Sequence, residues 1–270
     1  MDLGGKSFEI SDKLKQFFVD CDYLIGNFEA TLTHKPKQWM MDQIHDEQVL
    51  ESLAKLFSAD KTFLSVANNH AGDFQKDIFM ASCGAVENAG FHIFGLNEKP
   101  YVDITPTLRI FGASKWSNKP TGVISKLRSK DSFNLNTECF NILYPHWGWE
   151  LELYPRLETL NEGQEYIDKY DAIIGHHSHT PQPITIQEKK GVKKPLAYSL
   201  GDFCFGKPFK MFFYGEILKM DIGILENPSE LAQSKWAVGE FQWSFVKSII
   251  RDSKCVEIDL VDSIPFFNEI

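Results

Sequence analysis

The sequence predicts an α/β protein in which two packed sheets are covered by helices. Through the first two thirds of the chain, short apolar runs alternate with segments of helical periodicity, which is typical of a largely parallel sheet. From residue 216 onward the pattern becomes strand-like: Val256, Ile258 and Leu260 share one face, and acidic residues alternate with them. Together the two patterns favour an α/β sandwich over a barrel.

Each predicted element follows from local periodicity and from its boundary residues. Helices are expected where apolar residues recur every three or four positions: after a capping Ser11, at 49–57, at 73–89 with Gly90 as the stop, and at 158–169. Strands are expected at the short apolar runs 23–28, 62–67, 91–94, 108–113, 140–144 and 172–174. The late strands are expected at 216–225, 240–250 and 256–261.

Bulk properties narrow the class of protein. The length of 270 residues fits one large domain or two small ones, and we expect a single domain spanning 1–270. The net charge of -9 argues against nucleic-acid binding. No apolar run approaches the ~18 residues of a membrane span, and the first ten residues do not resemble a signal peptide. The five cysteines are scattered without a CxxC pair. As written, the chain is therefore expected to be cytoplasmic, without a membrane segment.

Four apolar runs end in clusters of polar side chains, at 24–29, 65–70, 143–148 and 173–179. In open α/β sheets, ligands bind beyond the carboxyl ends of the strands. Four such clusters therefore predict one shared site.

The most informative cluster holds three of the eight histidines, at 176, 177 and 179. Side chains alternate along an extended backbone, so His177 and His179 are expected to face the same way and chelate metal ions. Gly175 is expected to let the chain turn sharply. The alternative is a polar loop with incidental histidines.

The donor types favour Mn, Fe or Zn, because glutamate, asparagine and histidine are present without cysteine. Glu29 has two oxygens with which to bridge two cations, Asn69 offers an amide oxygen, and His146 offers ring nitrogens. For Asn27, Asn68 and Asn69 the alternative is turn chemistry. For His146 the alternative is a structural histidine.

Five motifs together resemble one family, the CapA-type capsule (poly-gamma-glutamate) synthesis proteins of the calcineurin-like metallophosphoesterase superfamily. They are Gly-Asn-Phe-Glu, Ala-Asn-Asn-His-Ala-Gly-Asp, His-Trp-Gly, Gly-His-His-Ser-His and Tyr-Ser-Leu-Gly-Asp-Phe, in this order between residues 24 and 205. The resemblance implies a four-layer αββα sandwich of two mixed sheets, like that of metallophosphatases, and a site for two divalent metal ions.

The resemblance also implies a role for each matched residue. His70 is the expected catalytic acid. The expected metal ligands are Glu29, as the bridging carboxylate with Asn27 beside it, and Asn69, His146, His177 and His179. The residues expected to contact substrate are Asn68, His176, Trp147 and Asp202, although core packing is the alternative for Trp147.

One departure from the family concerns the first metal. The family opens with a strand ending in Gly-Asp, whose aspartate is a ligand, and no such strand precedes Leu24. Asp2 lies in a different context. We therefore expect a weakened first metal site and an intact second one, and two tightly held ions per chain would refute this.

The function implied is metal-dependent hydrolysis of a phosphoester in capsule or poly-gamma-glutamate biosynthesis, with a phosphoester or an acidic polymer as substrate. Two alternatives stay open at this stage. One is a weakly active or non-catalytic component of a capsular polymer assembly system. The other is cleavage or transfer at a polyglutamate amide, because both reactions need a metal-bound nucleophile.

Overall fold

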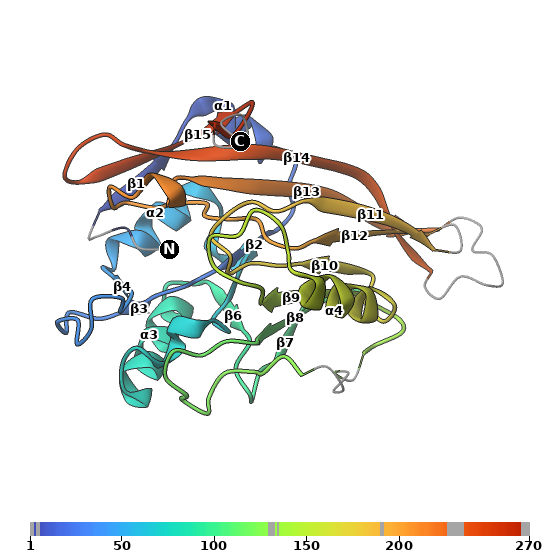
Figure 1. Ribbon diagram of the computed structural model, residues 1–270, viewed down its shortest axis with the longest axis horizontal. Coiled ribbons are helices and arrows are strands. Elements are labelled where there is room, and N and C mark those ends of the chain that lie inside the picture. The colour runs from blue at the N-terminus through green and yellow to red at the C-terminus, as the bar shows by residue number, and fades with distance from the viewer. Residues whose placement is uncertain are drawn as a thin grey trace.

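The computed structural model describes residues 3, 6–128, 133, 135–189, 192–225 and 235–265, and Asp2 lies outside them. It has α/β architecture with several sheets (Figure 1). The largest sheet is six-stranded, with parallel pairing in its centre and an antiparallel strand at each edge. Its strand order is β11 (Ile184–Lys189), β12 (Val192–Ala197), β10 (Ala172–Ile174), β9 (Phe140–His146), β8 (Leu108–Ser114) and β7 (Tyr101–Thr105).

The other sheets divide into a parallel and a mainly antiparallel group. The three-stranded sheet is parallel, with the order β2 (Leu24–Asn27), β5 (Thr62–Ser65) and β6 (His92–Phe94). The four-stranded sheet has the order β1 (Ser7–Ile10), β15 (Cys255–Val261), β14 (Trp236–Ile250) and β13 (Tyr214–Ile224). A two-stranded sheet pairs β3 (Thr31–Leu32) with β4 (Ile44–His45). The predicted antiparallel tail is confirmed by the β13–β14 and β14–β15 pairings.

Among the described residues, four α-helices cover the sheets: α1 (Asp12–Phe17), α2 (Gln48–Leu56), α3 (Lys76–Asn88) and α4 (Leu157–Ile167). The cap predicted for the first helix is confirmed, because Ser11 Oγ accepts a hydrogen bond from the Leu14 amide. Gly90, at φ +93°, follows α3 as predicted. Short 3-10 turns lie at Ala59–Lys61, Asn69–Gly72 and Lys210–Phe212. No helix in the described part of the chain is long and apolar enough to cross a membrane.

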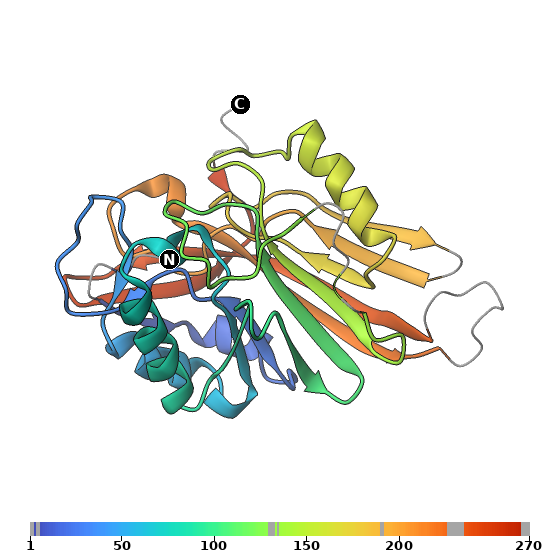
Figure 2. The same ribbon diagram turned by 90° about the horizontal axis from the view of Figure 1, so that it is seen from below.

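Apolar side chains gather in three clusters that connect these elements. One joins the α1–α3 helices to the three- and four-stranded sheets, through residues such as Leu14 and Val256. A second contains Phe94, Tyr144 and Trp236, and lies between those sheets and the six-stranded sheet. The third packs α4 on the opposite face of the six-stranded sheet (Figure 2). This packing places the carboxyl ends of β2, β5, β9 and β10 near one another.

Candidate metal centre

The carboxyl end of β2 presents a buried carboxylate. Asn27 Nδ2 donates a hydrogen bond of 2.6 Å to Glu29 Oε2, and Asn68 Nδ2 donates one of 3.0 Å to the Phe28 carbonyl oxygen. Glu29 is only 4% exposed, and its Oε1 has no hydrogen-bond partner. An unpaired buried carboxylate oxygen is costly unless a positive charge compensates it. This oxygen therefore fits a metal ion.

Histidines from β9 and from the segment after β10 complete the group. Ligand atoms of Glu29, His146 and His176 all lie within 4.8 Å of one another. His146 Nε2 lies 2.9 Å from Asn69 Oδ1 and 3.7 Å from Glu29 Oε1. Three sequence-predicted ligands, Glu29, Asn69 and His146, thus converge from three different strand ends.

The hydrogen bonds of His146 define a role for His176. An amide oxygen only accepts, so His146 Nε2 donates to Asn69, and the 2.7 Å contact between the two Nδ1 atoms then has His176 as donor. His176 Nε2 is left with a lone pair, and it is buried without a hydrogen-bond partner. A bare imidazole lone pair is what a metal ion binds.

The backbone after β10 is not extended. The prediction that alternation along a strand orients His177 and His179 is therefore wrong. His177 and His179 have φ of +108° and +60°, so strand alternation does not orient their side chains. Their rings nevertheless lie 6.3 Å apart, and His179 Nε2 is 3.9 Å from Glu29 Oε1. The His177 ring is 4.4 Å from that of His146, and its Nδ1 has no hydrogen-bond partner. Both histidines therefore lie next to Glu29 and His146, but a turn rather than a strand places them there.

Asp202 orients one of these rings. Its two carboxylate oxygens lie 3.0 and 3.1 Å from His179 Nδ1, which directs Nε2 towards Glu29. A carboxylate behind a histidine in this way fixes the tautomer and strengthens a metal ligand. Asp202 was predicted to contact substrate; it lines the cavity at the histidines, and its contact with His179 also gives it a positioning role.

Burial keeps most of the histidine cluster neutral. It lowers the pKa of His146 and His176 well below the ordinary value, with neighbouring rings adding to the effect. Burial and the nearby His179 lower the pKa of His177 to about 3. Burial also opposes a charge on His179, but Asp202 and Glu29 raise its pKa to about 9. Neutral imidazole is the ligand form.

His70 lies beside the group with partners of its own. Its Nδ1 donates to Asp73 Oδ2 over 2.6 Å, and the Asn68 side chain caps the turn by accepting from the His70 amide. Asn118 Nδ2 lies 3.4 Å from His70 Nδ1, and Asn69 Nδ2 lies 3.3 Å from Asn118 Oδ1. Sequence reasoning assigned no role to Asp73 or Asn118. The spacing of three residues between His70 and Asp73 could have indicated that Asp73 contacts the His70 ring. Asn118 lies in a loop far along the chain, so no local spacing indicates its position.

Trp147 is a core residue, which corrects the prediction that it contacts substrate. It is 1% exposed, its Nε1 donates to the Tyr198 carbonyl oxygen, and it packs against aromatic rings around α4. The aromatic residue near the site is Trp116, whose ring lies 6.1 Å from that of His177. Trp116 packs against Trp149, which is 38% exposed. Sequence reasoning missed Trp116 because it lies in the same distant loop.

A cavity of about 160 Å³ opens onto the cluster and is lined by Asn27, Glu29 and the three histidines at 176, 177 and 179. Glu216 of β13 also lines it, and burial raises the pKa of its carboxyl to about 8. No pattern singled out Glu216, because it alternates with apolar residues as any strand residue does.

Gly175 has a role other than the predicted sharp turn. A Cβ at this position would lie 2.1 Å from the Tyr198 carbonyl oxygen and 2.4 Å from Trp147 Nε1. We expect Gly175→Ala to lower the free energy of unfolding by at least about 3 kcal/mol, because neither neighbour can retreat from the core. The matched control is Gly84→Ala in α3, where a Cβ meets nothing within 4 Å and helix propensity predicts a gain of about 0.5–1 kcal/mol. Urea unfolding of both variants measures the difference, and a neutral Gly175→Ala would contradict this packing.

Comparison with known proteins identifies the family. Residues 6–109 and 124–207 match the family model described as "Bacterial capsule synthesis protein PGA_cap". The matched ranges contain every sequence-predicted site residue, and the chain belongs to this family of bacterial capsule synthesis proteins.

The chain is also similar to a curated protein of known name, the PGA biosynthesis protein CapA of Bacillus subtilis (strain 168). The two are 26% identical over 216 residues, and the alignment covers 71% of this chain. The aligned region spans 55% of that protein's length.

Two residues near the site, Asn118 and Glu216, lie outside the ranges that the family model matches.

Proposed function

We propose that the chain binds divalent metal ions through Glu29 and His176, with Asn69, His177 and His179 as further ligands. His146 joins them in its other tautomer, with the proton on Nδ1, which replaces the hydrogen bonds to Asn69 and His176. Asn27 would hold Glu29 through its amide. The observation that carries this proposal is the convergence of buried donors, since Glu29 Oε1 and His176 Nε2 lack partners within a group only 4.8 Å across. Oxygen and nitrogen donors without thiolate suit Mn, Fe or Zn. Up to two ions are proposed, the first held weakly.

We propose further that the layers correspond to the four-layer αββα arrangement of metallophosphatases. The three core clusters support this, because each lies between two successive layers. One lies between α4 and the six-stranded sheet, the next between that sheet and the three- and four-stranded sheets, and the last between those sheets and helices α1–α3. In such an arrangement the strand ends at Asn27, Asn69 and His146 face a common site, as their contacts indicate.

The activity proposed is hydrolysis of a phosphoester during capsule or poly-gamma-glutamate biosynthesis. Bound metal ions supply a nucleophile at neutral pH and offset the charge on phosphoryl oxygens. His70 protonates the leaving oxygen, and Asp73 holds the ring through Nδ1 so that Nε2 can deliver the proton. Trp116 lies beside His177 and packs against Trp149, and the two rings would border an incoming substrate.

The test combines metal analysis with an activity assay. Protein stripped with a chelator and reloaded with Mn²⁺ is expected to hold metal after gel filtration, by mass spectrometry, and to hydrolyse bis-p-nitrophenyl phosphate only when loaded. One tightly held ion is expected. Metal binding with no hydrolysis across a panel of phosphomonoesters and phosphodiesters would instead identify a non-catalytic component of a polymer assembly system. Failure to retain metal would refute the proposed site.

A further inference from the structure

The loop that follows β8 connects two strand ends of the metal centre. We call its residues 115–119 the strap. The Lys115 amide donates a hydrogen bond of 2.9 Å to the His146 carbonyl oxygen, and the Asn118 amide donates one of 3.0 Å to the Asn69 carbonyl oxygen. The strap therefore joins the carboxyl end of β9 to the turn that follows β5. It lies outside the ranges that the family model matches.

Two lysines hold the strap at its ends. Lys115 Nζ donates hydrogen bonds of 2.7 and 2.8 Å to two glutamates of α4. Lys119 Nζ lies 3.3 Å from the buried carboxylate of Asp42 and 3.2 Å from the Asp73 carbonyl oxygen. Because each ammonium group has two oxygen acceptors, the position of the strap is defined at both ends.

Gly72 allows the strap to lie against the turn that carries Asn69 and His70. A Cβ at this position would lie 1.8 Å from the Lys119 carbonyl oxygen, so any other residue would push the strap away. The position of the strap is therefore set by close backbone packing as well as by its lysines.

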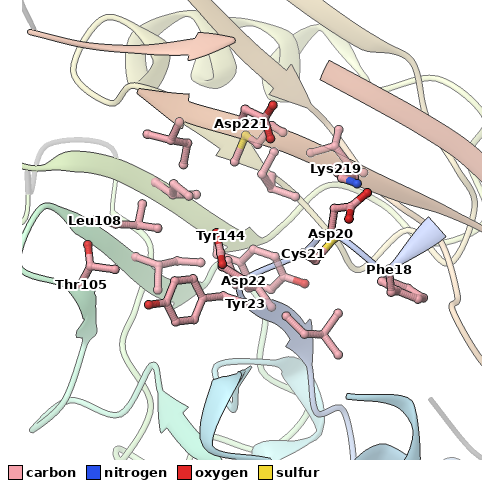
Figure 3. A pocket seen from close by; sticks show the side chains of 18 of the residues that line it. Phe18, Asp20, Cys21, Asp22, Tyr23, Thr105, Leu108, Tyr144, Lys219 and Asp221 are labelled. Atoms are coloured by element: carbon pink, nitrogen blue, oxygen red, sulfur yellow. The ribbon is translucent and has the colours of Figure 1, made fainter. Parts of the chain in front are cut away.

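The strap contacts the metal centre away from the two hollows near the histidines. The larger hollow, of about 550 Å³, is bordered by β2 and β13 and has Tyr144 in its wall (Figure 3). Tyr144 also lines the cavity of about 160 Å³, and its ring centroid lies 4.6 Å from that of His176. No residue of the strap lines either hollow. A substitution in the strap therefore leaves both linings unchanged.

The strap orients the side-chain amide of Asn69. Asn69 Nδ2 donates a hydrogen bond of 3.3 Å to Asn118 Oδ1, and Asn69 Oδ1 faces His146 Nε2 at 2.9 Å. The two ends of an amide have nearly the same shape, but only the oxygen has lone pairs for a hydrogen-bond donor or a metal ion. The acceptor on Asn118 therefore selects the orientation in which the Asn69 oxygen faces the metal centre.

This contact is the one that Asn69 keeps in the metal-bound form. His146 then carries its proton on Nδ1 and gives up its hydrogen bond to Asn69. Among the described residues, the hydrogen bond to Asn118 is the one that remains to the Asn69 side chain. Without it, nothing in this part of the chain would distinguish the two orientations of the amide.

The nearby His70 ring is not a hydrogen-bond partner of Asn118. Asn118 Nδ2 lies 3.4 Å from His70 Nδ1, but this nitrogen donates to Asp73 Oδ2 over 2.6 Å and has no free lone pair. Asn118 therefore acts on the metal centre through Asn69.

We propose that Asn118 is a positioning residue of the metal centre, and that it holds the Asn69 amide with its oxygen towards the bound ion. This role rests on the proposed binding of metal by Asn69. Partners that hydrogen-bond to a metal ligand contribute about 10–100-fold to metal affinity. Asn118 is exposed and water competes for its oxygen, so we expect the lower end of this range.

The test measures the Mn²⁺ affinity of the full chain by competition with a fluorescent chelator. Asn118→Leu keeps the approximate volume but removes the acceptor, and it should weaken Mn²⁺ binding about tenfold. Asn118→Asp keeps an acceptor oxygen for Asn69 Nδ2 and should bind at least as tightly as the parent. Because Asn118 is exposed, both variants are expected to fold. The matched control is Ser117→Ala, an exposed neighbour in the strap, which should leave the affinity unchanged.

A double-mutant cycle with Asn69→Ala separates positioning from a general disturbance of the site. Asn69→Ala retains Glu29 and the histidines, and it is titrated at higher Mn²⁺ concentrations. In this background Asn118→Leu should cost nothing further, because the ligand that it orients is gone. An equal loss in both backgrounds, parental affinity of Asn118→Leu, or an equal loss in Asn118→Asp would overturn the proposal. Failure of the parent to bind Mn²⁺ would refute the proposed metal site and, with it, this role.

Discussion

Glu29→Gln is expected to abolish retention of Mn²⁺ and, with it, phosphoester hydrolysis. The variant keeps the shape of the side chain and an oxygen for Asn27 Nδ2, but it removes the carboxylate charge at the centre of the group. Loss of a residue that merely supports a ligand already costs 10–100-fold in metal affinity, so loss of a ligand itself should cost at least about 100-fold. Competition with a fluorescent chelator measures the affinity.

The matched control is Glu216→Gln, which changes a second buried carboxyl in the lining of the same cavity. Glu216 is not part of the group of three, so this variant should keep its metal. Metal-free Glu29→Gln should be at least as stable to urea as the metal-free parent, because Glu29 Oε1 is buried without a partner. If Glu29→Gln bound Mn²⁺ as tightly as the parent, the proposed centre would be in the wrong place.

The elements that sequence predicted best are those whose signals are local. Ser11 sits three residues before Leu14, and the cap that this spacing predicts is present. The strand β1 (Ser7–Ile10) was missed because four residues carry little periodicity, and its partner β15 lies some 250 residues away along the chain. Pairing at such a distance leaves no trace in a local window.

The candidate site, too, could be predicted only in part. Parallel strands end at one edge, so clusters at four strand ends could be expected to meet, and Glu29, Asn69 and His146 do. The roles within the histidine cluster could not be predicted, because the positive φ of His177 and His179 breaks the alternation that the argument assumed. Asn118 and Trp116 lie in a loop whose position depends on tertiary packing, which no local sequence pattern indicates.

His70→Ala is expected to lower kcat about 10²–10⁴-fold while metal content is unchanged. His70 is not in the group of three, and its Nδ1 is committed to Asp73. A general acid matters most when the leaving oxygen is strongly basic. The loss should therefore be larger for methyl phenyl phosphate than for bis-p-nitrophenyl phosphate, whose leaving group departs without a proton. Asp73→Asn should show the same dependence with a smaller loss, because the ring is present but less well held.

The control is His34→Ala, which removes an exposed histidine that belongs neither to the metal group nor to the lining of its cavity, and it should leave kcat unchanged. The ratio of the two substrates separates protonation from a general disturbance of the site. A misplaced metal group would slow both esters alike, whereas loss of the proton donor slows the poorer leaving group more. If His70→Ala reduced both rates equally, or lost its metal, His70 would be a structural or ligand residue and the acid would have to be sought elsewhere in the cavity.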